Sequence, residues 1–209
     1  MLGAMSSFYR VLYRIGFTPW EHGLAQAAVA EQISAMYARE EAGRQPPYGR
    51  ALDLGCGSGI HSVELARRGW QVTGIDLVEQ AVERARARAV EARVDVRFVP
   101  GDVTDLARTD VGSGYRLLLD FGMVHGLTDE QRVGVARGVD AVAAPDASFL
   151  VLAFPPGSRG PLPRGMSRGD IETLYAGWQV SDETPSAGEL PLFLRLLRAD
   201  PRWYRLRRR

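Results

Sequence analysis

From about residue 50 onward, short apolar runs alternate with stretches of helical periodicity, and this alternation constrains the fold of the chain most. Five apolar runs are predicted to be strands: 50–55, 70–76, 95–102, 115–122 and 148–154. The segments at 60–69 and 78–92 have the spacing of amphipathic helices. Strands that alternate with helices predict a parallel sheet covered by helices on both faces.

The second half of the chain adds two helix starts and a change of pattern. Thr128 to Gln131 fits a capping box before a helix that Pro145 should end, and Ser167 to Asp170 offers another helix start. The segments 178–185 and 192–199 then resemble two strands of a hairpin, which implies one antiparallel strand.

The chain of 209 residues is long enough for one well-packed domain and short for two. We expect a helical N-terminal segment at 1–45, a core at 46–200 and an Arg-rich tail at 201–209. The net charge of +1 gives no general attraction to nucleic acid or to an anionic membrane. The single Cys, the lack of a membrane-spanning apolar run and the absence of a signal-peptide pattern predict a cytoplasmic protein.

All 26 basic residues are Arg, and the chain contains neither Lys nor Asn. A Schiff-base lysine and the lysine of a GxxxxGK[ST] phosphate loop are therefore excluded. A metal site with an Asn ligand is also impossible, and we predict no metal site.

The most specific local signal is "LDLGCGSGIHSVELA" at 52–66, a glycine-rich loop between a predicted strand and a predicted helix. Gly55, Gly57 and Gly59 would let the backbone approach a ligand closely, next to the amide groups of a helix start. The dinucleotide fingerprint GxGxxG/A fails, because its sixth position is Ile60. The loop instead has Asp53 two residues before its first glycine.

Two more acids follow the next predicted strands. Asp76 ends the second strand, 21 residues after Gly55, where a carboxylate accepts hydrogen bonds from ribose hydroxyls in doubly wound folds. Asp102 ends the third strand. The spacing therefore predicts a nucleoside-containing ligand.

With "LDLGCGSG", "VTGIDL" and "GDVTDL" in this order, the sequence resembles the class I S-adenosylmethionine-dependent methyltransferases over residues 17–199. The resemblance implies a doubly wound α/β fold with a mostly parallel, seven-stranded Rossmann-like sheet. It also implies one antiparallel strand in a C-terminal hairpin and an N-terminal helical lid. S-adenosylmethionine is the implied cofactor.

The family implies a role for each matching position. The loop around Gly55, Cys56, Gly57 and Gly59 would surround the methionine part of the cofactor, with Asp53 orienting it and Cys56 packing inside it. Asp76, next to Leu77, would bind the ribose. Asp102 would accept from the adenine amino group beside Val103, and Asp120 would lie near the methionine end and the methyl acceptor.

Two further stretches resemble the thiopurine and tellurite-resistance group of small-molecule methyltransferases: "PWEHG" at 19–23 and "DFGMVHGL" at 120–127. We interpret Trp20 as part of a lid, against the cofactor or acceptor; the alternative is an anchor for an N-terminal helix. His125 is predicted to act as a base or to orient the acceptor. Its alternative is a helix-start histidine bonded to backbone.

The predicted function is in-line transfer of a methyl group to an O, S or N atom of a small molecule, without a metal. Two alternatives stay open: a non-catalytic protein that binds S-adenosylmethionine for regulation, and an RNA methyltransferase that uses the Arg-rich tail. The sequence leaves the oligomeric state open between monomer and homodimer.

Overall fold

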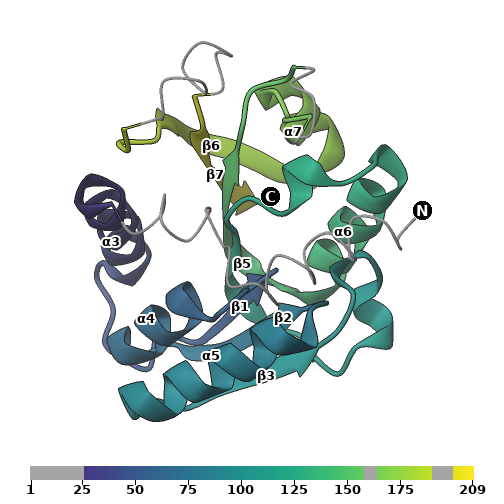
Figure 1. The fold of residues 1–209 in the computed structure, drawn as a ribbon. Coiled ribbons are helices and arrows are strands. Elements are labelled where there is room, and N and C mark those ends of the chain that lie inside the picture. The colour runs from purple at the N-terminus through teal and green to yellow at the C-terminus, as the bar shows by residue number, and fades with distance from the viewer. Residues whose placement is uncertain (1–25, 158–163, 190–199) are drawn as a thin grey trace.

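The computed structural model describes residues 26–157, 164–189 and 200–209, and a seven-stranded sheet runs through this part (Figure 1). The strands are β1 (Arg50–Leu54), β2 (Gln71–Asp76), β3 (Val96–Pro100), β4 (Tyr115–Asp120), β5 (Ala143–Ala153), β6 (Trp178–Pro185) and β7 (Arg202–Arg208). Their order is β3-β2-β1-β4-β5-β7-β6. Neighbours from β3 to β5 are parallel, whereas β7 is antiparallel to both β5 and β6. The predicted fold class is therefore confirmed.

Helices cover both faces of the sheet, because apolar residues of the central strands point alternately to the two sides. In β4, Leu117 and Leu119 join a cluster with the helix α3, whereas Leu118 joins the cluster of the opposite face. The helices are α3 (Ala27–Glu41), α4 (Ile60–Arg68), α5 (Glu79–Ala92), α6 (Asp129–Val142) and α7 (Arg168–Leu174). Two short 3-10 helices, η1 (Val103–Arg108) and η2 (Val124–Gly126), follow β3 and β4.

Both predicted helix starts are confirmed as capping boxes. Thr128 accepts a hydrogen bond from the Gln131 amide and Ser167 one from the Asp170 amide, with the reciprocal bonds also present. The fifth strand begins at Ala143, earlier than predicted, so Pro145 lies inside β5. Pro145 is tolerated there because the register with β4 shifts in this stretch, where a ladder hydrogen bond is not required.

The prediction of an Arg-rich tail at 201–209 is wrong, because this segment forms β7, between β5 and β6. Its apolar residues Trp203, Tyr204 and Leu206 are buried and hold the strand in the sheet. The hairpin partner of β6 is thus β7, whereas the predicted strand at 192–199 lies outside the described residues.

The arginines of β7 are bonded within the chain. Arg205 contacts Glu40 of α3, with 2.5 Å between Nε and Oε1, and Glu40 also accepts from Ser148 Oγ of β5 at 2.6 Å. Glu40 is buried and therefore ties α3 to two strands. The described part of the predicted lid is thus a helix fixed on the sheet. The rest of the predicted lid, with Trp20, lies outside the described residues.

Candidate functional site

Acidic side chains gather where the parallel strands end. Asp53 is the fourth residue of β1, Asp76 and Asp120 are the last residues of β2 and β4, and Asp102 lies two residues after β3. Since β3, β2, β1 and β4 are adjacent and parallel, these residues share one edge of the sheet. This edge is where ligands bind in open α/β folds.

The glycine-rich loop connects β1 to α4 at the same edge. Gly55, Gly57 and Gly59 all have positive φ angles, of 67°, 54° and 77°. At Gly59 a Cβ atom would lie 2.8 Å from the Ala85 Cβ, so packing against α5 also requires glycine. Gly59 is the N-cap of α4 and offers no side-chain cap, which leaves helix-start amides for an anionic group.

Asp76 holds the glycine loop to the end of β2. Its carboxylate accepts hydrogen bonds from the amide of Gly57 at 2.9 Å and from the amide of Val78 at 2.8 Å. Burial raises its pKa above the ordinary value, and these backbone bonds oppose the shift. Leu77, the next residue, is exposed at the rim of this edge.

Asp53 is buried below the loop and accepts a hydrogen bond from Ser62 Oγ at 2.6 Å. Burial raises the pKa of Asp53 to about 7; the Ser62 bond lowers it, and the charges of Asp76 and Asp120 raise it. Three carboxyl groups near one edge therefore favour a cationic ligand there, because a positive charge would stabilise their ionised forms.

Replacing Asp53 with asparagine should stabilise the protein increasingly between pH 4 and pH 7. Burial raises the folded-state pKa, so Asp53 keeps its proton in the folded protein up to a pH of about 7, whereas the unfolded chain loses it near the ordinary value of 3.8. Below the unfolded pKa both states are protonated and the wild type loses no stability. As pH rises from there through about 7, ionisation favours the unfolded chain and the wild type loses stability. Above pH 7 the variant should be more stable by about 2–4 kcal/mol, at 1.36 kcal/mol per pKa unit. Thermal unfolding of both proteins across this pH range measures the difference. The exposed Asp95, replaced in the same way, is the control; an equal gain at every pH would contradict the account.

Asp102 and Val103 begin the segment after β3. Asp102 caps η1 by accepting from the Thr104 amide at 2.8 Å and from Thr104 Oγ1 at 2.7 Å. Val103 is buried below it. This local ring of bonds fixes the backbone of Val103 at the edge of the sheet, where a ligand amide or amino group could be bound.

Asp120 organises the turn after β4. It is completely buried, and its oxygens accept from the amides of Gly122, Met123 and Val124 at 3.2, 2.7 and 3.0 Å. Burial raises its pKa to about 6, against the opposing effect of these bonds. Asp120 thus fixes the turn after β4 from a fully buried position, and its place near the methionine end and the methyl acceptor stays a prediction.

His125 lies in η2, directly after this turn, and is buried. The amide of Phe154, just past β5, donates to its Nδ1 at 3.2 Å. Burial lowers the pKa of His125 to about 4; a hydrogen bond to the backbone of Leu152 opposes the shift, and the Arg132 charge adds to it. The ring is therefore neutral at physiological pH.

Arg132 of α6 holds the segment that carries His125. Its guanidinium is buried and donates to the carbonyls of Val124, His125 and Gly165 at 3.2, 2.8 and 3.0 Å. The side chain thus joins η2 to Gly165, three positions before α7. Sequence reasoning missed Arg132, since its spacing resembles that of a surface arginine.

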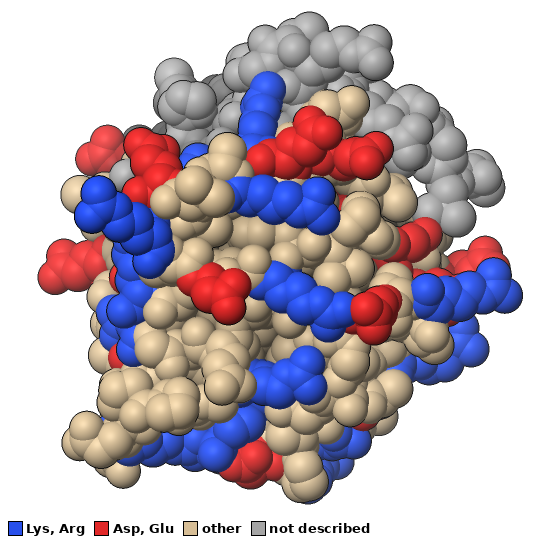
Figure 2. Space-filling view, turned by 90° about the horizontal axis from the view of Figure 1, so that it is seen from below, with Lys and Arg blue, Asp and Glu red and all other residues tan. Residues whose placement is uncertain are grey.

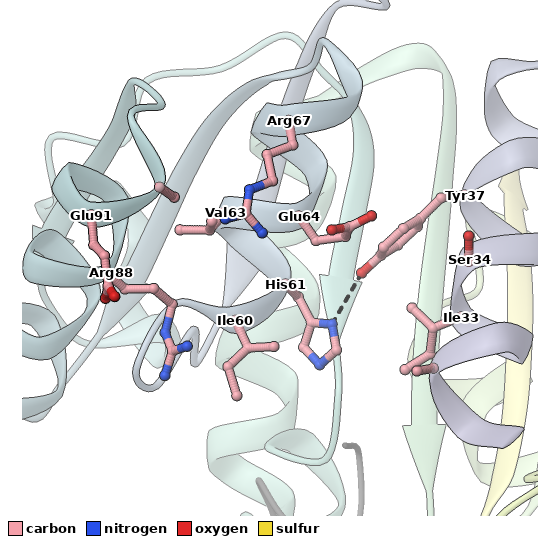
Figure 3. Close-up of a pocket in the computed structure, with 12 residues that line it drawn as sticks. Ile33, Ser34, Tyr37, Ile60, His61, Val63, Glu64, Arg67, Arg88 and Glu91 are labelled. Carbon is pink, nitrogen blue, oxygen red and sulfur yellow. Dashed lines mark hydrogen bonds between the residues drawn. The ribbon is translucent and has the colours of Figure 1, made fainter. Parts of the chain in front are cut away.

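A cavity of about 650 Å³ lies between α3 and α4, beside the start of α4 (Figure 3). His61 points into this space, with Nδ1 at 3.3 Å from the hydroxyl of Tyr37. Its ring packs edge-on against Phe121, the residue after β4, at 4.5 Å between centroids. Burial lowers the pKa of His61 to about 4. His61 therefore connects α3 to the end of β4 as a neutral ring.

The predicted site residues that lie within the described ranges come together at one edge of the sheet. Their roles in binding and catalysis stay predictions. Cys56 is buried, and burial raises its thiol pKa well above the ordinary value, in line with a packing residue. Within 26–157, 164–189 and 200–209, no three His, Cys, Asp or Glu side chains gather as metal ligands would. The glycine loop and the strand-end acids together suit a nucleoside-containing cation at this edge.

This combination of sheet order, glycine loop and strand-end acids defines the class I methyltransferase fold. Residues 51–146 match the family described as "Methyltransferase domain". The structure also superposes with a TM-score of 0.74 on Burkholderia thailandensis 1,6-didemethyltoxoflavin-N1-methyltransferase, solved with S-adenosylhomocysteine. That alignment covers 98% of this chain and 87% of the other at 21% identity.

Two relatives in sequence are also methyltransferases. The chain is 29% identical to 2-heptyl-1-hydroxyquinolin-4(1H)-one methyltransferase of Mycobacteroides abscessus, over 80% of this chain and 71% of that protein. It is 44% identical to the ubiquinone biosynthesis O-methyltransferase of Xanthomonas axonopodis pv. citri, over 33% of this chain and only 29% of that protein. The chain is therefore a class I S-adenosylmethionine-dependent methyltransferase, of the group that acts on small molecules, as the sequence predicted.

Proposed function

We propose that the chain transfers the methyl group of S-adenosylmethionine to an O, S or N atom of a small organic acceptor, without a metal. One observation carries the proposal: the bond from the Gly57 amide to Asp76 joins the glycine loop to the acid at the end of β2. The ribose and methionine parts of the cofactor would bind on these two elements. Asp102 and Val103 would bind the adenine, beside Leu77.

The reaction needs alignment more than it needs activation. A sulfonium loses its methyl group to a nucleophile in line with the C–S bond, and the leaving thioether is neutral. The enzyme must hold the two reactants close and exclude water. The nearby Asp53 and Asp120 carboxyl groups provide a site with negative potential for the sulfonium.

The relatives support an acceptor with a ring and a heteroatom. The Mycobacteroides protein is named for a hydroxyquinolone. The Xanthomonas protein is named an O-methyltransferase and the Burkholderia protein an N1-methyltransferase, so the methylated atom differs between these two. The acceptor would lie beyond β4, between His125 and the His61 side of the sheet. Trp20, outside the described residues, remains a prediction as part of a lid.

The RNA-methyltransferase alternative finds no support in the described residues. Arg202, Arg205 and Arg207 contact Glu183, Glu40 and Ser148 within the chain. The face in Figure 2 mixes basic and acidic side chains, where RNA binding favours a basic stripe.

None of the helices in the described ranges has the length and apolarity needed to cross a membrane. The cytoplasmic location and the oligomeric state stay predictions.

Incubation with S-adenosylmethionine labelled in the methyl group tests the proposal. The protein is offered a panel of phenols, N-hydroxy heterocycles, thiols and amines, and product is detected by mass spectrometry. We expect label in at least one acceptor. Binding of S-adenosylhomocysteine without transfer to any member would favour the alternative of a non-catalytic regulatory protein.

A further inference from the structure

We propose that the cavity between α3 and α4 holds the methyl acceptor, and that His61 binds the polar group of this acceptor through its Nε2 atom. This inference rests on the proposed function and deepens it. It narrows the acceptor to an uncharged ring compound that carries a hydroxyl, N–H or carbonyl group.

The first observation is that one nitrogen of the His61 ring lacks a partner. Nδ1 lies 3.3 Å from the hydroxyl oxygen of Tyr37, whereas Nε2 is buried and has no hydrogen-bond partner among the described residues. Nearly all buried polar atoms in folded proteins have a partner, because a buried polar atom without one is unfavourable. A ligand that bonds to Nε2 would supply the missing partner.

The second observation is the space into which the ring points. Figure 3 shows His61 in the cavity of about 650 Å³, between Ile60 of α4 and Ile33 of α3. A cavity of this size suits a small organic molecule. The side chains of Ile33, Tyr37 and Val63 are buried and form an apolar part of its wall. An aromatic ring would pack against this wall while its polar group bonds to Nε2.

One end of the cavity reaches the edge of the sheet where the cofactor is proposed to bind. Ile60 and His61 are the first two residues of α4, directly after Gly59 of the glycine loop. The His61 ring also packs against Phe121, the first residue after β4. A molecule bound at Nε2 would therefore lie beside both the glycine loop and the end of β4, and methyl transfer requires such proximity.

The charges around the cavity favour an acceptor without charge. Its wall carries two basic and two acidic side chains, namely Arg67, Arg88, Glu64 and Glu91. These charges balance, and the His61 ring is neutral at pH 7 because burial lowers its pKa to about 4. A charged acceptor would lose its hydration without a net attraction in return.

The Tyr37 hydroxyl allows His61 to bind either kind of neutral polar group. When this hydroxyl donates to Nδ1, the ring carries its proton on Nε2 and can donate to a carbonyl. When the hydroxyl accepts from Nδ1, the lone pair on Nε2 can accept from a hydroxyl or an N–H. Burial raises the pKa of Tyr37 well above its ordinary value, so the hydroxyl keeps its proton and both arrangements are available.

The experiment measures binding of two probes of similar shape, 1-naphthol and 1-methylnaphthalene, by equilibrium dialysis with and without S-adenosylhomocysteine. Replacing His61 with leucine should weaken binding of 1-naphthol about 2- to 12-fold relative to 1-methylnaphthalene, as expected for one hydrogen bond between neutral groups. His61→Gln, which keeps a polar group, should recover part of this loss. An unchanged ratio of the two dissociation constants in His61→Leu would overturn the proposal, as would a lack of saturable 1-naphthol binding to wild type.

A pair of variants on α3 tests the location without changing His61. Ala30 is exposed and lines the cavity, so Ala30→Trp should fill the space and abolish binding of both probes. Ala35 is exposed on the same helix and is not part of the cavity wall, so Ala35→Trp is the matched control. Full binding of 1-naphthol to Ala30→Trp would show that the probe binds elsewhere.

Two further readouts separate this site from the cofactor site and from a site for anions. His61→Leu should leave the Kd of S-adenosylhomocysteine unchanged, whereas a loss as large as that for 1-naphthol would place His61 at the cofactor. The anion 1-naphthoate should bind more weakly than 1-naphthol, and tighter binding would contradict the acceptor class. Failure of the proposed function shows differently, as no methyl transfer to any acceptor of the broader panel.

Discussion

Replacing Arg132 with methionine is expected to lower both the free energy of unfolding and the turnover of the enzyme. The variant removes three donors from the carbonyls of Val124, His125 and Gly165. Bonds from a charged donor contribute about 1.5–3 kcal/mol each, and release of the buried cation to water offsets part of their loss. We therefore expect a net loss of about 2–4 kcal/mol, or about 5–15 °C in Tm for a chain of this size.

Turnover should fall about 10- to 100-fold, because His125 would lose the clamp that positions it. Arg137, exposed on the same helix, is the matched control and should tolerate methionine with neither effect. Thermal unfolding and methyl-transfer kinetics on both variants measure the two effects separately. A stable, fully active Arg132→Met protein would show that η2 is held by other contacts.

Replacing Asp76 with alanine should weaken binding of S-adenosylhomocysteine about 10- to 150-fold. A hydrogen bond to a charged group contributes about 1.5–3 kcal/mol, and the proposed bond is to the ribose. The variant also removes the acceptor of the Gly57 amide, so the loop that would surround the methionine part loosens. Both losses act on the same ligand.

Calorimetric titration compares this variant with Asp76→Asn, which keeps one acceptor oxygen and should lose less affinity. Asp95→Ala, at the opposite end of the sheet before β3, serves as the control for a lost surface charge. An unchanged dissociation constant in Asp76→Ala would mean that the ribose is bound by other residues.

The strand ends could be predicted from the sequence because the signals there are local. The glycine loop and Asp76 lie within 22 residues of one another, and each follows an apolar run that forms a strand. The alternation of strands and helices then places Asp102 and Asp120 at the same edge. Short-range spacing therefore defined the architecture and the candidate cofactor site.

Contacts between distant segments could not be predicted, because a contact partner far along the chain leaves no local signal in the sequence. Arg205 resembled a solvated tail residue because its partner, Glu40, lies 165 positions away. A local signal was present, since Tyr204 and Leu206 alternate with arginines as in a half-buried strand. The hydrogen bond from the Phe154 amide to His125 Nδ1 spans 29 positions and involves a backbone group, so no side-chain motif records it.

The most direct test of the central claim compares the binding of two ligands to the wild-type chain. Isothermal titration calorimetry is performed with S-adenosylhomocysteine and, separately, with NAD. We predict saturable binding of S-adenosylhomocysteine to a single site and no detectable binding of NAD, because Ile60 stands where the dinucleotide fingerprint requires a small residue. NAD bound more tightly than S-adenosylhomocysteine would contradict the account.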